Sequence, residues 1–244
     1  MKFLFPLLLT LPLLGEEPEL TKDTLENLKL PGVKVNIGEK SIDVTSSVCL
    51  HEGSLEFIAC TKDTKEHESI IMVEARPRHI HTALLLLGAK AGHPAIRKMV
   101  GDEDNPRFID LPPEGSPISV YLVISGEDGK QVERPIADFI SKIDYEADPN
   151  GEVVKKAGDR LKTFLFAGSH LYGKEGTPKT YLADNSGSVI SLSTFGDELL
   201  CLPGVYEKQN QALQWEINSE HLPKIGTEVI LRLRPQEPKE EPKK

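Results

Sequence analysis

The sequence is short of several features, and each shortage excludes a class of protein. It contains only three cysteines, none of them in a CxxC pair or an iron–sulfur spacing, so an iron–sulfur cluster is excluded. It has no run of basic residues, and 38 acidic residues against 29 basic ones give a formal charge of −9. Clustered Lys and Arg are what bind phosphate groups, so nucleic acid and anionic membranes are excluded as partners. Phosphate loops and dinucleotide fingerprints are also missing, which leaves a nucleotide cofactor without support.

A short apolar run occurs at the N-terminus, and no later run is long enough to hold the chain in a membrane. Lys2 precedes the apolar stretch 3–14, and Gly15 separates that stretch from two glutamates. This pattern is typical of a signal peptide over residues 1–15, because a membrane-spanning helix needs about 20 apolar residues. We therefore expect an exported, soluble protein, periplasmic or extracellular, with a linker over 16–29 and a disordered, charged tail over 236–244.

Export would place the three cysteines, Cys49, Cys60 and Cys201, in an oxidising compartment, where an odd count leaves one thiol unpaired. An expected hairpin around Glu52 and Gly53 separates Cys49 from Cys60 by about 13 Å along the strands. A disulfide needs Cα atoms within about 7 Å, so Cys201 is the better partner for either of the two. The pairing itself stays open.

Short strands dominate the apolar pattern, and they do not alternate with helices. Strands are expected at 33–37, 41–45, 47–50, 55–60, 70–75, 118–125, 163–166, 180–183, 189–192, 213–217 and 229–233. One helix is bracketed by Pro77 and Gly88, and a second is expected over 136–143. Residues 38–39, 127–129 and 184–187 have the composition of turns, and the turn at 127–129 leads to a return strand through Val132 that would pair with the strand at 118–125. We predict an α+β fold with a mostly antiparallel sheet and two or three short helices over residues 30–235, as one domain or as two subdomains split near 150–160.

The stretch "TKEHES", residues 64–69, places four ionisable side chains directly before an apolar strand. If residues 52–53 and 62–63 both form two-residue turns, period-two alternation puts His67 on one face with Cys60 and Glu56. The stretch would then lie at one end of the sheet, in a polar cluster formed by side chains from three strands. A slip of one residue in register would reverse these faces.

Four segments of the chain resemble a known family. They are "EFIACTKDTKEHESIIMVEARPRHIHTALLLLGAKAGHP", "FLFAGSH", "YLADNSGSVISL" and "HLPKIGTEVILRLRP", and together they resemble the YdjY-domain family of exported bacterial proteins. The shared order is a Cys, a Lys-Glu-His-Glu block and a helix in which a His precedes Leu-rich sequence. The resemblance covers roughly residues 30–235. It implies no particular activity, because none is established for the family, and this chain lacks the clustered cysteines that the ferredoxin-like label of some members requires.

The candidate ligand-binding residues are Lys65, Glu66 and His67, with His81 from the following helix. On a strand, His79 and His81 would form a metal clamp, but on a helix their rings diverge by roughly 200°, which leaves His81 on the inward, Leu-rich face. His67, His81 and Glu66 could together hold a divalent metal, with an open position for water. The HExxH and GxSxG motifs are absent, so the common zinc-protease and serine-hydrolase arrangements are not indicated.

Three interpretations of the block 65–68 follow. In the first, the protein is an exported binding domain of unknown activity that holds a small ligand, a metal ion or a protein partner there. In the second, it is a zinc-dependent hydrolase that uses His67, His81 and Glu66. In the third, Lys65, Glu66 and Glu68 pair with Arg76, with Arg78 or with each other and only support the fold. We favour the first, because no complete catalytic motif accompanies the block, and whether any reaction is catalysed stays open.

Overall fold

The structure is a computed structural model that describes residues 28–102, 105–126, 128–144, 154–157, 161, 163–204 and 215–237. The expected signal peptide, most of the linker and most of the charged tail lie outside these ranges. No helix within them is both long and apolar enough to cross a membrane.

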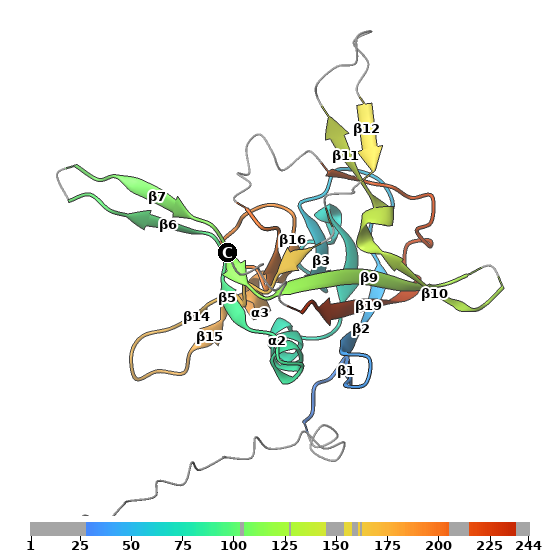
Figure 1. Ribbon diagram of the computed structural model, residues 1–244, viewed down its shortest axis with the longest axis horizontal. Coiled ribbons are helices and arrows are strands. Elements are labelled where there is room, and N and C mark those ends of the chain that lie inside the picture. Colours follow the sequence, from blue (N-terminus) through green and yellow to red (C-terminus); the bar gives the residue numbers. More distant parts are fainter. Residues whose placement is uncertain are drawn as a thin grey trace, which may run out of the picture.

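The centre of the molecule is a closed barrel of eight strands (Figure 1). In order around the barrel they are β2 (Ser41–Val48), β19 (Glu228–Pro235), β9 (Pro117–Ser125), β13 (Phe164–Leu165), β17 (Leu200–Cys201), β16 (Ser188–Ser191), β3 (Phe57–Thr61) and β4 (Ser69–Val73). Strand β4 pairs back with β2 and closes the ring. Neighbours are antiparallel except for the pairs β16–β17 and β3–β4, which are parallel.

The interior of the barrel is filled by alternate residues of its long strands. Val44 of β2 lies opposite Leu231 of β19, which lies opposite Leu122 of β9, and all three are fully buried. Side chains alternate between the two faces of a strand, so one apolar residue in two is enough to fill a barrel of this size. The helix α2 (Pro77–Leu86) begins with Pro77 at its first position and buries Ile80 and Leu84.

The predicted α+β class is wrong, because strands make up 43% of the structure and helices only 12%. The expected helix over 136–143 is a single 3-10 turn, η2 (Ile136–Phe139), followed by strand β11 (Ile140–Asp144). Strand β11 pairs with β12 (Val154–Ala157) and β18 (Trp215–Ile217) in a separate small sheet. Three isoleucines in this segment favour an extended backbone, because branching at Cβ restricts the side chain more in a helix.

Two of the predicted hairpins pair correctly, whereas those expected at 52–53 and 62–63 do not form. Strand β1 (Val33–Asn36) pairs with β2 through a four-residue connection, and β9 pairs with β10 (Gln131–Pro135). Strands β2 and β3 are not neighbours, because β4 lies between them. The β3–β4 pair is parallel, so residues 62–68 must return along the barrel to the starting level of β3. The predicted polar face of His67, Cys60 and Glu56 rested on two antiparallel hairpins and is therefore wrong.

The expected hairpin turn at 184–187 is instead part of the short helix α3 (Leu182–Ser186), which ends at Gly187 in the left-handed conformation. A Cβ on Gly187 would lie 2.3 Å from Oγ1 of Thr64 and 2.8 Å from Oγ1 of Thr61. Only glycine therefore lets the segment after β3 pack against the end of α3.

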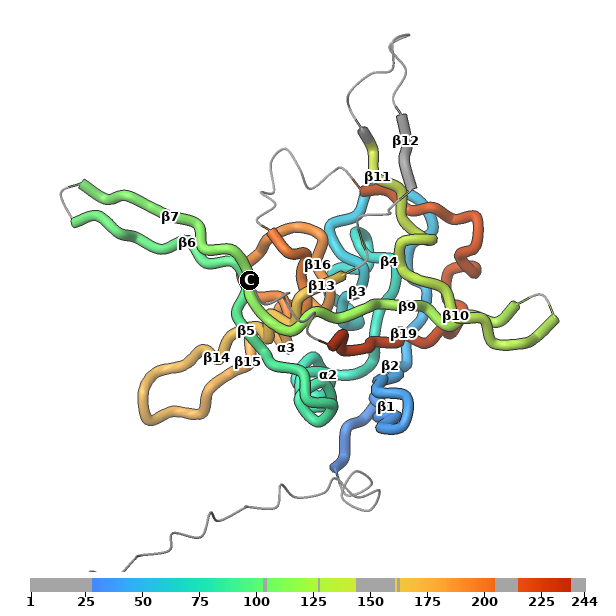
Figure 2. The backbone as a smooth tube through the Cα atoms, viewed as in Figure 1, coloured from blue at the N-terminus to red at the C-terminus, as the bar shows by residue number. Residues whose placement is uncertain are grey.

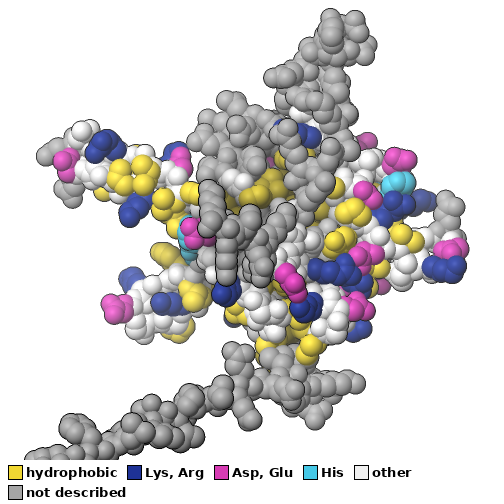
Figure 3. Space-filling model, viewed as in Figure 1, with side chains coloured by type: hydrophobic (Ala, Val, Ile, Leu, Met, Phe, Trp, Pro, Cys, Tyr) yellow, Lys and Arg dark blue, Asp and Glu magenta, His cyan; other side chains and the backbone are white. Residues whose placement is uncertain are grey.

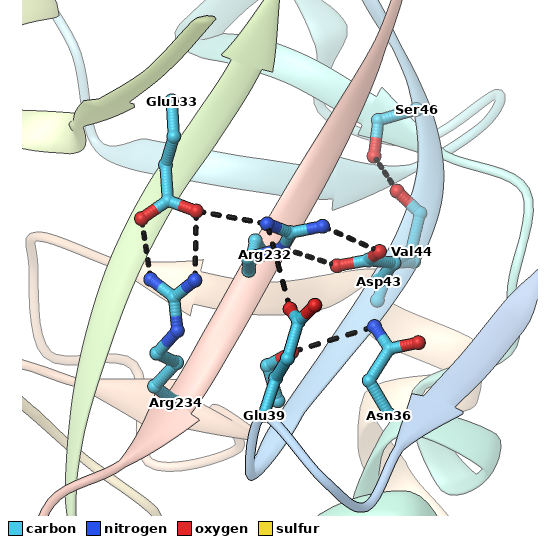
Figure 4. Close-up of polar contacts among 9 residues, drawn as sticks. Asn36, Glu39, Asp43, Val44, Ser46, Glu133, Arg232 and Arg234 are labelled. Carbon is cyan, nitrogen blue, oxygen red and sulfur yellow. Dashed lines mark hydrogen bonds and ion pairs between the residues drawn. The ribbon is translucent and has the colours of Figure 1, made fainter. Parts of the chain in front are cut away.

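A ladder of charged side chains crosses the outer surface of β2, β19 and β10 (Figure 4). Arg232 donates two hydrogen bonds to Asp43, at 2.6 and 2.8 Å, and a third to Glu133 at 2.9 Å. Arg234 donates to the same Glu133. Burial alone would raise the pKa of Asp43, but hydrogen bonds from Arg232 and Asn36 bring it below its usual value. The ladder ties three strands together on the face opposite the apolar interior.

Two hairpins extend away from the barrel, both at the left of the view in Figures 1 and 2. The first arm consists of β6 (Ile96–Met99) and β7 (Phe108–Leu111), and it rises from a base formed by β5 (Ala91–His93) and β8 (Glu114–Gly115). The second arm consists of β14 (Leu171–Tyr172) and β15 (Thr180–Tyr181). No element was predicted for residues 91–115 or for 171–172.

Candidate functional site

The block 65–68 lies in the connection that returns from β3 to β4, with the 3-10 turn η1 over Glu66–Glu68. The side chain of Lys65 points back to the barrel, where Nζ donates a hydrogen bond to Oγ of Ser188 at 2.9 Å. The same Nζ lies 4.2 Å from the ring centroid of Phe57 and 4.8 Å from that of Phe195. These two rings stack with their centroids 4.6 Å apart. Lys65 therefore fastens the returning connection to strands β3 and β16.

The other members of the block have separate roles. The Glu66 carboxylate accepts hydrogen bonds from the backbone N–H groups of Asp63 and Thr64, so it caps the turn that precedes it. The side chain of His67 is 77% exposed, and its Nε2 lies 3.9 Å from the carboxylate of Glu68. Arg78 does not pair with the block, as the purely structural interpretation expected, but with Asp184 of α3. His67 is the member of the block that faces solvent.

The three cysteines are free thiols, so none of the disulfides considered from the sequence is formed. Cys60 neighbours Cys49, against the expectation that Cys201 would be nearer to either. Interaction with the neighbouring Cys49 side chain lowers the pKa of Cys60, although burial acts in the opposite direction. Sγ of Cys49 donates its proton to the backbone oxygen of Ser69 at 3.2 Å.

His81 lies in α2 and is half-buried at a polar contact between three elements. Its Nδ1 lies 2.8 Å from the hydroxyl of Tyr181, and that hydroxyl donates to the backbone oxygen of Gly168, also at 2.8 Å. Because the tyrosine proton is used in the second bond, Nδ1 of His81 carries a proton and donates it to Tyr181. The ring of Phe166 packs edge-on against the imidazole at 4.8 Å. Burial lowers the pKa of His81, so the neutral form is favoured.

The residues around His81 are also the root of both arms. Gly92 in the base of the first arm donates its N–H to the backbone oxygen of Phe166 at 2.9 Å, and Tyr181 belongs to the second arm. A Cβ on Gly168 would lie 2.8 Å from Cβ of Ala91 and 3.3 Å from Cε1 of His81. The chain can pass between the helix and the first arm only because residue 168 has no side chain. His81 is therefore a positioning residue for the two arms.

The residues proposed as metal ligands do not fit a metal ion. Among the described residues, no group of three or more His, Cys, Asp or Glu side chains is arranged to hold one, and this includes Glu66, His67 and His81. His67 faces solvent in the β3–β4 connection, whereas His81 is packed against Phe166 and Tyr181. The structure thus separates the two histidines that the hydrolase interpretation needed to bring together.

The arms present large apolar side chains to solvent, and the sequence analysis missed them. Met99 is 51% exposed and Phe108 is 59% exposed in the first arm, and Leu171 and Tyr172 in the second arm are 64% and 71% exposed. Figure 3 shows apolar side chains spread along the first arm. The sequence contained a signal for the first arm, because apolar residues flank the polar segment "GDEDNP" on both sides in a pattern typical of a hairpin.

The fold and the arms define a compact β-barrel domain that carries two projecting hairpins. The chain belongs to the YdjY domain family, whose model matches residues 33–234. This match confirms the resemblance found in the sequence. No curated protein and no solved structure matches the chain significantly.

Proposed function

We propose that the protein is a binding domain that holds an extended, apolar segment of another protein along its first arm. The observation that carries this proposal is a two-stranded ribbon that projects from the barrel with Met99, Phe108 and Ile109 exposed. Large apolar side chains exposed together on one projecting element of a folded protein are typical of an interaction site.

The pairing within the first arm leaves it incomplete. Among the described residues, β6 and β7 pair with each other and with no third strand. A two-stranded hairpin with no packed face is at best marginally stable in water. Both of its outer edges offer backbone N–H and C=O groups to an added strand, which is a common way to recognise an extended peptide.

Both faces of the first arm carry apolar pairs. Met99 lies opposite Phe108 on one face, while Ile96 lies opposite Leu111 on the other, with Ile109 beside them. A strand added at either edge of the arm would place its alternating apolar side chains beside these pairs. The second arm begins at the same root, so Leu171 and Tyr172 supply further apolar surface for the same partner.

We further propose that this binding takes place outside the cytoplasm. The support is the signal-peptide pattern of residues 1–15, which lie outside the described part of the chain. N-terminal sequencing of the mature protein, recovered from the exported fraction, would test this by showing whether the chain starts near Glu16.

Binding of a small ligand at the block 65–68 is a weaker candidate. Of the four residues predicted to bind a ligand, Lys65 and Glu66 already have partners within the chain. His81 lies apart from them, at the root of the two arms. A zinc-dependent hydrolase is not supported, because Glu66, His67 and His81 do not converge.

The experiment is a selection of peptides from a random displayed library on the purified protein, followed by affinity measurement. We expect enrichment of peptides with alternating apolar residues. Their affinity should fall about tenfold or more in the double variant Met99→Ser, Phe108→Ser, since two apolar contacts of about 1 kcal/mol each would be lost. Bound peptide should also slow amide hydrogen exchange at residues 96–99 or 108–111.

The control is the double variant Ile37→Ser, Val132→Ser, which removes two exposed apolar side chains far from the arms in the sequence. It should bind the selected peptides like the wild type. Selected peptides that bind the arm variant unchanged would contradict the proposal. A concentration-dependent dimer that the arm variant abolishes would also contradict it, by making a second copy of the chain the occupant.

A further inference from the structure

The two faces of the first arm carry different charges. Strands β6 and β7 pair in a register that sets Lys98 opposite Ile109, and successive side chains of a strand point to opposite faces. The backbone N–H of Val100 donates to the backbone oxygen of Arg107 at 2.8 Å, which extends the pairing by one step. The cationic face therefore consists of Ile96, Lys98, Val100, Arg107, Ile109 and Leu111, and the neutral face consists of Arg97, Met99, Phe108 and Asp110.

The charges of the neutral face cancel each other. Arg97 lies opposite Asp110 and donates two hydrogen bonds to its carboxylate, from Nε at 2.8 Å and from Nη2 at 3.1 Å. These hydrogen bonds lower the pKa of Asp110, so the carboxylate is ionised at neutral pH. The neutral face thus has no net charge, and it offers Met99 and Phe108, each more than half exposed, to a partner.

The charges of the cationic face have no such counterpart. Lys98 and Arg107 are exposed, and within the described part of the chain neither side chain forms a hydrogen bond or an ion pair. The acidic residue at the tip of the arm, Asp102, accepts a hydrogen bond from the backbone N–H of Asn105 at 2.7 Å. The chain as a whole has a formal charge of −9, so the two cations are a local exception. Carboxylates of another molecule would compensate them through charge-assisted hydrogen bonds.

The second arm combines the same two kinds of side chain. Lys174 and Lys179 are exposed in the segment that connects β14 to β15, and neither forms an ion pair with a described residue. That segment contains one acidic residue, Glu175, and follows directly after the exposed Leu171 and Tyr172. Figure 3 shows basic side chains on both arms. Apolar and basic side chains therefore occur together on both projecting parts of an acidic protein.

We propose that the segment held by the first arm is acidic as well as apolar, with Glu or Asp beside the cationic face and apolar residues beside the neutral face. The inference rests on the proposed function, since it specifies the chemistry of the segment that the arm would bind. A strand added at either edge of the arm sends alternate side chains to each face. A simple alternation of acidic and apolar residues therefore satisfies both faces at once.

Each edge of the arm presents one of the two cations to an added strand. A strand beside β6 meets Lys98, and a strand beside β7 meets Arg107, which directly precedes β7. Side chains on the same face of neighbouring strands lie about 5 Å apart, where opposite charges attract and like charges repel. The guanidinium of Arg107 can also bind a carboxylate through two parallel hydrogen bonds. An acidic segment is thus favoured, and a basic one disfavoured, at either edge.

The test uses three short peptides that share Val, Ile and Phe at one set of alternate positions and carry Glu, Gln or Lys at the other set. Each peptide is labelled with a fluorophore and titrated with the full mature protein at neutral pH, and its affinity is read from fluorescence anisotropy. The Glu peptide should bind about threefold or more tighter than the Gln peptide, as expected for an exposed ion pair, and the Lys peptide should bind most weakly. Raising the ionic strength from about 0.05 M to about 0.5 M should remove most of the preference for Glu, because salt screens exposed charges.

The decisive variant is Lys98→Gln, Arg107→Gln, which removes both cations of the cationic face. Its affinity for the Glu peptide should fall about threefold, to that for the Gln peptide, while its affinity for the Gln peptide stays the same. The matched control is Lys62→Gln, Lys224→Gln, which removes the same charge from two exposed positions outside the arms and should keep the preference for Glu. Circular dichroism shows that each variant is folded.

The outcomes separate this inference from the proposed function. Equal affinity of the wild type for the Glu and Gln peptides would overturn the inference alone, as would a preference that the Lys98, Arg107 variant retains or that the control also loses. No binding of any of the three peptides, or binding that Met99→Ser, Phe108→Ser leaves unchanged, would overturn the proposed function and the inference with it. Phosphatidylglycerol vesicles that bind the wild type but not the Lys98, Arg107 variant, without binding of the Glu peptide, would make a lipid surface the occupant and overturn the inference as well.

Discussion

Apolar side chains of the same kind are buried in the barrel and exposed on the first arm. Phe164 in barrel strand β13 is fully buried, whereas Phe108 in arm strand β7 is 59% exposed. Each barrel strand has a neighbour on both sides, but β6 and β7 have only each other among the described residues. The contrast separates two uses of apolar surface, because burial in the barrel stabilises the fold and exposure on the arm does not. The apolar side chains exposed on the arm add little stability, as expected for a surface that another molecule covers.

The largest expected effect comes from truncating one phenylalanine in each region. Phe164→Ala should destabilise the protein by about 3 to 5 kcal/mol, because it leaves a cavity in a packed interior. Phe108→Ala should change the free energy of unfolding by no more than about 0.5 kcal/mol. Urea denaturation of both variants measures the difference. Similar losses in the two would show that the arm packs against the barrel and would break the comparison.

A smaller effect is expected from the charged ladder on the barrel wall. Asp43→Asn should cost about 2 kcal/mol at neutral pH, because it removes a two-bond pair with Arg232. The pKa of Asp43 is lowered by folding, so its contribution is present above its usual value of 3.8 and is lost as the pH falls below it. Urea denaturation across this range should show a shallower loss in the variant than in the wild type. Parallel curves would argue against the pair.

Lys65→Met should have an effect of about 1 to 2 kcal/mol, because it removes the bond to Ser188 and the contact of the charge with two rings. The matched control is Lys62→Met, since Lys62 is exposed in the same connection. Thermal unfolding should distinguish the two variants. Equal melting temperatures would show that these contacts add no stability and that Lys65 is available to bind a ligand.

The smallest effect concerns His81 at the arm root and depends on pH. Burial lowers the pKa of His81 below 6.5, so the neutral ring contributes stability above that pH and loses it as the pH falls. His81→Gln keeps a hydrogen-bond donor for Tyr181 but cannot titrate. The wild type should lose more stability than the variant when the pH is lowered from 7 to 5, as measured by urea denaturation. Identical losses would indicate that His81 stays accessible to water.

The sequence was informative where the signal is local. Pro77 and Gly88 bracket helix α2, and the alternation of residues 118–125 marks strand β9, because these patterns depend on a few adjacent residues. The inward position of His81 also followed from helical geometry. The export signal remains a prediction, since residues 1–15 lie outside the described ranges.

Pairing between distant segments could not be derived from local patterns. Alternation shows that 57–61 and 69–73 are strands, but it does not reveal that they run parallel or that β4 separates β3 from β2. The partners of Lys65 show the same limit, since Phe195 and Ser188 come from a remote part of the chain.

The position of β19 has a consequence for biogenesis. This strand comes last in the described chain, yet it lies between β2 and β9, which are formed much earlier. A chain without residues 228–235 therefore has one gap in the ring, with an unpaired edge on β2 and another on β9. The barrel can close only when β19 is present, whatever the order in which the other seven strands pair.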